Sequence, residues 1–206
     1  MFKINNMRQI DYEKIDDLEN KLRRDPDNLD LLSQKAFIYF LGYDDKNVIK
    51  IYDKIIQLYP DSIDAYMWLS YYFYQAMSDS FESIDIAKKG LTIDPKNAAL
   101  HLIIAWALDS LDEDNDEFKY NLQKAIEIEP TWITPRITFI DYLIRQKKYQ
   151  EAKDEINIAI KYFDPNFAVP KDPIKYQYEF YITGRADHSN KEMLENLFNN
   201  LRKNHE

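Results

Sequence analysis

Prolines recur along this chain at an almost constant interval. Pro26, Pro60, Pro95, Pro130 and Pro165 are separated by 34, 35, 35 and 35 residues. Each follows an apolar stretch with helical spacing, and a proline ends a helix because it lacks the backbone N–H that the next turn would need. A period of about 34 residues that closes on a proline is typical of a helical solenoid.

Each interval between prolines contains two apolar blocks. In the third interval, His101, Ile104 and Leu108 belong to the first block, and Phe118 and Leu122 belong to the second. Spacings of three and four residues place the members of a block on one face of a helix. The sequence therefore predicts an all-α fold of about eleven helices without a sheet. The turns within the helix pairs are expected near residues 42–45, 77–80, 111–115 and 146–149.

Polar and small residues recur at matching places in the periods. Asn28, Ser62 and Asn97 each come two residues after a proline, where the unpaired N–H groups of a new helix need a cap. Small residues stand where neighbouring helices must approach closely, and they are Ala36, Ser70, Gly90, Ala105, Ala125 and Ala159.

The proline ladder and the small residues in register with it resemble the tetratricopeptide repeat family over residues 25–165. The resemblance implies a right-handed superhelical solenoid of antiparallel helix pairs in a single domain, 1–206. An N-terminal capping helix, four repeat units and a degenerate C-terminal helix pair are expected at 8–24, 27–60, 61–95, 96–130, 131–165 and 173–203. The sequence departs from the family pattern at Ile140, which replaces a small residue, and at Leu32, His101 and Arg136, which replace an aromatic one.

Composition limits the classes of function. The chain has 206 residues, a net charge of −9 and no cysteine. The acidic excess argues against nucleic-acid binding, which needs clustered Lys and Arg, and favours a basic partner. No apolar run approaches the ~18 residues of a membrane span, and the first residues lack the pattern of a secretory signal. We therefore expect a cytoplasmic protein without membrane insertion.

Motifs for catalysis or metal binding are weak. The three histidines lack a second strong ligand at metal-site spacing, and His101 occupies a helix-packing position. The acidic run 109–117 alternates like a calcium loop, but Glu117 replaces the glycine of the turn and Gln123 replaces the bidentate glutamate. We therefore interpret the run as a solvated turn and expect no enzyme activity, no metal and no cofactor.

In the family that the chain resembles, the first helix of each unit lines the concave surface of the superhelix. Carried over to this sequence, that surface has an aromatic and apolar floor with acidic residues at its edges. Such an apolar strip marks an interaction site; the alternative is that helix packing buries much of it. The candidate partner-binding residues are Phe37, Phe40, Asp64, Met67, Trp68, Tyr71, Tyr74, Leu102, Trp106, Asp109, Ile137 and Asp141.

These residues predict a non-enzymatic module that binds a protein or peptide. Aromatic anchors would hold an apolar or amphipathic segment, and the acids would favour Lys or Arg beside it. The carboxylate grip of chaperone adaptors in the family is disfavoured because no positive charge stands at the matching positions, Ser33, Phe37, Trp68, Ala99 and Ile103. Two alternatives stay open: an immunity or antitoxin-like protein that masks a basic toxin, and a self-associating scaffold.

The same assignment predicts which truncations destabilise the fold. Phe73 and Leu108 are expected in the core, where truncation to alanine costs roughly 2–5 kcal/mol. If the ring of Tyr71 lines an open groove, its truncation should cost about 1 kcal/mol or less.

Overall fold

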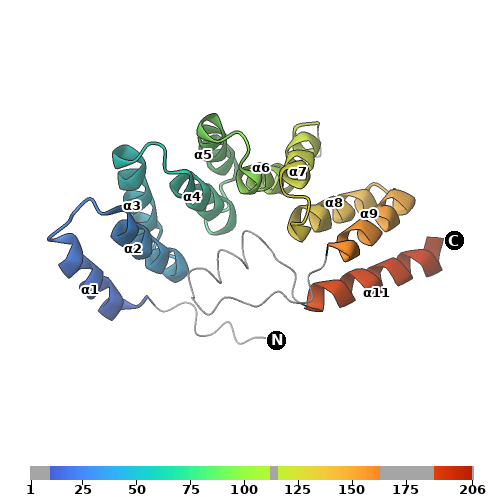
Figure 1. Cartoon of the computed structure of the whole chain (residues 1–206), viewed down its shortest axis with the longest axis horizontal. Helices are drawn as coiled ribbons and strands as arrows, with labels where there is room; N and C mark the ends of the chain where they lie inside the picture. The colour runs from blue at the N-terminus through green and yellow to red at the C-terminus, as the bar shows by residue number, and fades with distance from the viewer. Residues whose placement is uncertain (1–9, 112–115, 163–187, 206) are drawn as a thin grey trace. The chain divides into compact units, whose positions relative to one another are not determined.

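The computed structural model describes residues 10–111, 116–162 and 188–205, in which every regular element is an α-helix (Figure 1). No strand occurs in these ranges, in agreement with the sequence-based prediction. None of the helices in the described part of the chain combines the length and apolar character that crossing a membrane requires. The helices are α1 (Tyr12–Leu22), α2 (Leu29–Gly42), α3 (Asp45–Leu58), α4 (Ile63–Gln75), α5 (Ser80–Ile93), α6 (Ala98–Ser110), α7 (Asp116–Ile128), α8 (Ile133–Arg145), α9 (Tyr149–Lys161) and α11 (His188–His205).

The predicted cap residues precede helices, but only two of them use their side chains. Asn28 accepts a hydrogen bond from the backbone N–H of Leu31 at 3.0 Å, and Asn97 accepts one from Leu100 at 3.0 Å. Each bond satisfies an N–H group that the start of a helix leaves unpaired. Ser62 precedes α4 without a side-chain capping bond, so the expectation of a cap is wrong there.

The turns inside three helix pairs contain a residue with a left-handed backbone. Tyr43, Ser78 and Lys147 have φ angles of 56°, 54° and 58°. In the first of these turns the backbone N–H of Asp44 bonds back to the carbonyl of Tyr39 at 3.1 Å, which satisfies a carbonyl at the end of α2. These turns confirm the predictions near 42–45, 77–80 and 146–149, whereas residues 112–115 lie outside the described part of the chain.

The chain divides into two compact units, which we describe separately. Unit 1 comprises residues 1–96 and 106–113, and unit 2 comprises residues 97–105 and 114–206. Helix α6 therefore contributes its C-terminal residues, including Trp106, to unit 1. The expected single domain and its internal boundaries stay predictions.

In unit 1, helices α1 to α5 build a core along the predicted apolar faces. Helix α2 packs against α1 and α3, and α4 packs against α3 and α5. The small residues Ala36 and Ser70 are fully buried, as their spacing predicts. Ser70 tolerates burial because its hydroxyl donates to the carbonyl oxygen of Met67 at 2.9 Å.

In unit 2, α8 packs against α7 and α9, and α11 packs against α9. Ala125 and Ala159 are fully buried, as expected for small residues at helix contacts. Arg136, which stands where the family has an aromatic residue, is also buried. Its guanidinium donates to the carboxylate of Glu155 at 2.9 Å and lies over the ring of Tyr162, so the buried charge is paired.

The two ends of the chain depart in part from the prediction. The first helix begins at Tyr12 instead of residue 8, because Asp11 caps it by accepting a hydrogen bond from the backbone N–H of Lys14 at 3.0 Å. Helix α11 corresponds to the second half of the helix pair predicted for 173–203. Residues 163–187, which include the first half of that pair and Pro165, lie outside the described residues.

Candidate partner-binding site

Seven aromatic rings of unit 1 form a continuous series of ring contacts, which we call the aromatic cluster. The ring centroids lie 5.4 Å apart for Phe37 and Trp68, 5.5 Å for Phe40 and Trp68, and 5.9 Å for Tyr74 and Trp106. Rings attract one another at separations of about 4.5–7 Å. The cluster consists of Phe37, Phe40, Trp68, Tyr71, Tyr72, Tyr74 and Trp106.

Helical spacing and the repeat together explain why these rings meet. Phe37 and Phe40 stand three residues apart on α2, as do Tyr71 and Tyr74 on α4. Residues three apart are neighbours on a helix surface. Phe37, Tyr71 and Trp106 occupy equivalent places in three successive repeats, so the same helix face presents a ring each time.

The aromatic cluster has a buried base and a partly exposed edge. Phe37 and Tyr71 are only 6% and 5% exposed, and Tyr72 is fully buried. Phe40, Trp68, Tyr74 and Trp106 are partly buried and keep some solvent-accessible surface. The buried base can therefore hold the edge rings in place while the edge itself remains available for contact.

Four candidate residues favour the alternative in which helix packing covers the predicted surface. Phe37, Met67, Tyr71 and Leu102 are all buried, so helix packing takes much of the surface that the repeat positions assign to a groove. Because Tyr71 is buried, its truncation should cost more free energy of unfolding than the roughly 1 kcal/mol of a groove residue. That these residues bind a partner stays a prediction.

The two positions expected in the core differ from each other. Leu108 is buried, as predicted. Phe73 is only partly buried and packs against the core of unit 1 from its edge. The helix face assigned to the core is thus correct, but the ring of Phe73 lies at the margin of that core.

Tyr72 ties the base of the aromatic cluster to α3. Its hydroxyl donates a short hydrogen bond to the carboxylate of Asp45, in the first turn of α3. Burial raises the pKa of Tyr72 well above its ordinary value, and the hydrogen bond to Asp45 raises it further. The bond fixes α4 against the start of α3 and so positions the rings beside Tyr72.

Two of the three candidate acids belong to unit 1. Asp64 is exposed in the first turn of α4. Asp109 is partly buried and lies close enough to Tyr74 to raise its pKa, although burial of the ring is the larger cause. Asp109 therefore places negative charge beside one of the partly exposed rings of the cluster.

The remaining candidates, Leu102, Ile137 and Asp141, belong to unit 2. Leu102 is fully buried and Ile137 is partly buried. The exposed carboxylate of Asp141 accepts a hydrogen bond from Nε of Arg145 at 3.1 Å, so a cation of its own helix already stands beside it.

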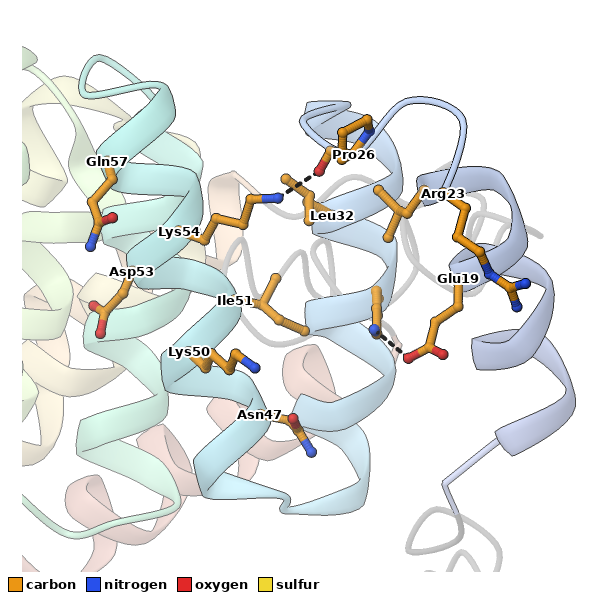
Figure 2. A pocket seen from close by; sticks show the side chains of 12 residues that line it. Glu19, Arg23, Pro26, Leu32, Asn47, Lys50, Ile51, Asp53, Lys54 and Gln57 are labelled. Atoms are coloured by element: carbon orange, nitrogen blue, oxygen red, sulfur yellow. Dashed lines mark hydrogen bonds and ion pairs between the residues drawn. The ribbon is translucent and has the colours of Figure 1, made fainter.

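A second feature of unit 1 was missed by the sequence analysis. Helices α1, α2 and α3 border a cleft of about 790 Å³, which we call the cationic cleft (Figure 2). Lys50 and Lys54 are four residues apart on α3, which is a signal visible in the sequence, but the contribution of α1 depends on how that helix packs. The lining residues are Glu19, Leu22, Arg23, Pro26, Leu32, Lys35, Asn47, Lys50, Ile51, Asp53, Lys54 and Gln57.

His101 lies in the core, as the sequence predicts. Its Nδ1 lies 2.8 Å from Oδ1 of Asn121, whose Nδ2 donates to the carbonyl oxygen of Glu117 at 2.9 Å. The amide oxygen of Asn121 therefore accepts the hydrogen bond, and Nδ1 of His101 carries the proton. His101 thus has a structural role in helix packing. Within the described ranges, no group of three or more His, Asp or Glu side chains is arranged to hold a metal ion.

Comparisons with known proteins place the chain by its structure. No protein-family model matches the sequence, and a comparison with curated proteins found no match. The crystal structure of MamA is similar, with a TM-score of 0.60 and 19% identity, over 70% of this chain and 84% of that one. TTC0263, a thermophilic TPR protein of Thermus thermophilus, gives a TM-score of 0.58 and 17% identity over 81% of this chain and 86% of that one.

YrrB, a TPR protein with an unusual peptide-binding site, aligns over more of the chain. Its TM-score is 0.59 at 15% identity, with 91% of this chain and 93% of that one covered. Two of these three structures are thus tetratricopeptide repeat proteins that align over most of both chains. The chain therefore has the tetratricopeptide-repeat-like fold of antiparallel helix pairs that the proline ladder predicts.

Proposed function

We propose that the protein is a non-enzymatic interaction module that binds an apolar or amphipathic, basic segment of a partner protein at the aromatic cluster of unit 1. One observation carries this proposal: seven contacting rings from three helices are fixed at their base, while four of them keep accessible surface.

The partly exposed rings supply the apolar part of the site. Trp68 and Trp106 come from different repeats and are connected through Tyr71, whose ring lies 6.4 Å and 6.3 Å from theirs. Rings held in place lose little conformational freedom when a partner binds, which is why aromatic residues dominate the energetics of interfaces. Each such anchor contributes about 2 kcal/mol or more, measured by truncation.

The charges of unit 1 supply the preference for a basic partner. Asp109 lies beside the ring of Tyr74, and Asp64 is exposed at the start of the same helix. The chain as a whole carries a net charge of −9. Because exposed charges are screened beyond about 8 Å in physiological salt, these acids should affect the association rate more than the final affinity.

The similarity to YrrB supports a peptide as the class of ligand, because that protein has a peptide-binding site on the same fold. Two narrower hypotheses use the same surface: masking of a basic toxin, and self-association. Light scattering on the purified protein separates self-association from the binding of a different partner.

Peptide display tests the proposal. A library of random peptides of about 12 residues, three turns of helix, is panned on the full-length protein. We expect a class of peptides that combines Leu, Phe or Trp with Lys or Arg. Trp68→Ala combined with Trp106→Ala should weaken these peptides by about thirtyfold or more, as the loss of at least one anchor predicts.

Two exposed positions provide a control and a test of the charge preference. Phe81→Ala removes a ring that is 71% exposed and lies outside the aromatic cluster, and it should leave binding unchanged. Asp64→Lys reverses a charge at an exposed site, so it should slow the association of basic peptides, most strongly at low salt. The proposal is wrong if no basic amphipathic class is enriched, or if the affinity of that class survives the tryptophan changes and its association rate survives the Asp64 change.

A further inference from the structure

We propose that the cationic cleft between α1, α2 and α3 is a second binding site, which accepts an acidic amphipathic segment of a partner protein. This site is independent of the aromatic cluster and has the opposite charge preference.

The floor of the cationic cleft is apolar. Leu32 of α2 and Ile51 of α3 are buried but still line the cleft, and Leu22 of α1 is partly buried beside them. Figure 2 shows Ile51 projecting from α3 towards α2, between the lysines of its own helix. An apolar side chain of a partner would therefore meet an apolar surface there.

Four cationic side chains line the rim of the cleft, and two of them already form ion pairs. Nζ of Lys54 lies 2.6 Å from the carbonyl oxygen of Pro26 and 3.0 Å from the carboxylate of Asp27. Lys35 pairs with Glu19 at 2.7 Å. Arg23 and Lys50 make no ion pair with any residue in the described part of the chain, although the charge of Arg23 helps to lower the pKa of Glu19. Because Lys35 already pairs with Glu19, both cations can still bind a carboxylate of a ligand.

The cationic cleft is positively charged, although the whole chain has a net negative charge. The cleft is lined by four cationic side chains and two carboxylates, although the chain has 36 acidic and 27 basic residues. Glu19 is compensated by Lys35, and Figure 2 shows Asp53 on the side of α3 away from α1. A negatively charged ligand is therefore favoured here more than at the acidic edge of the aromatic cluster.

The chemistry of the lining favours a peptide over a nucleic acid. The rim cations could contact a phosphate backbone, but such a backbone has no apolar group to place on the floor. An acidic amphipathic peptide offers Leu-like side chains to the floor and carboxylates to the rim. The volume of about 790 Å³ lies within the range of about 300–1,000 Å³ that is typical of ligand sites. It holds a few side chains of such a segment.

The two sites use different faces of α2. Leu32 and Lys35 point into the cationic cleft, whereas Phe37 and Phe40 belong to the aromatic cluster. A change in one site should therefore leave the other intact, and the failure of one proposal does not decide the other.

The peptide display experiment tests this site with its own variants. We expect a second class of enriched peptides, in which Leu, Ile or Phe is flanked by Asp or Glu. Arg23→Gln combined with Lys50→Gln should weaken synthetic peptides of this class by about five- to tenfold, and should lower the salt dependence of their affinity. Lys14→Gln combined with Lys46→Gln is the matched control, because both lysines lie on α1 and α3 but outside the cleft.

Several results would overturn the assignment. One is a display experiment that enriches no acidic class; another is an acidic class weakened equally by the cleft variant and by the matched control. A fluorescein-labelled single-stranded oligonucleotide supplies the third test. If it binds more tightly than the acidic peptides and depends on Arg23 and Lys50, the cleft is a nucleic-acid site and the peptide assignment is wrong.

Discussion

The aromatic cluster and the cationic cleft share helix α2 but are built in different ways. Rings at equivalent repeat positions form the aromatic cluster, and contacts between these rings fix its base. The cationic cleft lies between the first repeat and α1, a helix outside the repeat pattern, and polar contacts such as Lys35 with Glu19 connect its rim.

The difference shows what the repeat controls and what it leaves free. Residues at equivalent positions of successive repeats make equivalent contacts, so apolar side chains pack together along one face of successive helices. Where the repeat array meets a terminal helix, a cleft with its own charge forms in an otherwise acidic chain. Substitutions in the two sites should therefore differ in their effect on stability, because one site belongs to the core and the other to the surface.

The largest effect is expected at the base of the aromatic cluster. Tyr71 is 5% exposed and contacts the rings of Phe40, Trp68, Tyr74 and Trp106. Tyr71→Ala should lower the free energy of unfolding by about 3 kcal/mol, because it removes a buried ring and leaves a cavity. Urea denaturation followed by circular dichroism measures the loss.

Phe81→Ala is the matched control for Tyr71→Ala. It also truncates an aromatic residue on a helix of unit 1, but its ring is 71% exposed. Its effect should stay within about 0.5 kcal/mol. Equal losses of unfolding free energy in the two variants would mean that the ring of Tyr71 is not buried in the core. The aromatic cluster and the cationic cleft would then both be surface sites.

The sequence predicts the fold well because its main features are local and periodic. Each proline, small residue or apolar stripe predicts a feature of one helix or of one contact between helices. Ala36, Ser70 and Ala125 are buried, as their small size at predicted helix contacts indicates. The turn near 42–45 was predicted, but the left-handed backbone of Tyr43 was not, since the glycine of this turn, Gly42, stands one residue before it.

The candidate site was predicted only in part. Sequence spacing assigns Tyr71 and Met67 to a helix face, but it cannot say how closely the next helix covers that face, and both are buried. The cationic cleft was missed for a related reason. Arg23 and Lys50 are 27 residues apart in the sequence and line one cleft only because α1 and α3 both pack on α2.

A medium effect is expected at the polar anchor of the aromatic cluster. Tyr72→Phe removes the hydrogen bond from the hydroxyl to Asp45 while keeping the ring, and should cost about 1 kcal/mol at neutral pH. The pKa of Tyr72 is raised in the folded state, so the unfolded chain loses its proton first, near pH 10. The contribution of Tyr72 is therefore present below about pH 10 and is lost as the pH rises above that value.

Urea denaturation at neutral pH and above pH 10 measures this dependence. The other tyrosines are common to both proteins, so their titration cancels in the difference between wild type and Tyr72→Phe. We expect the gap in stability to shrink at the higher pH. A gap that stays constant would show that the pKa of Tyr72 is not raised in the folded protein.

The smallest effect is expected at the ion pair that connects the rim of the cationic cleft. Lys35 lies 2.7 Å from Glu19, and its hydrogen bond and charge lower the pKa of that carboxyl. The carboxylate of Glu19 remains about half exposed, so solvent screening should limit the coupling to less than about 1 kcal/mol. A lowered pKa contributes stability above pH 4.5, and this contribution is lost as the pH falls below that value.

A double-mutant cycle of Glu19→Gln and Lys35→Met isolates the ion pair from the contact of Lys35 with the ring of Tyr39. The coupling should be measurable at neutral pH and should vanish in acid or in high salt. A coupling of several kcal/mol that persists in salt would mean that the pair is effectively buried. The rim of the cationic cleft would then contribute as much to stability as the base of the aromatic cluster. The two sites would no longer differ as a core site and a surface site.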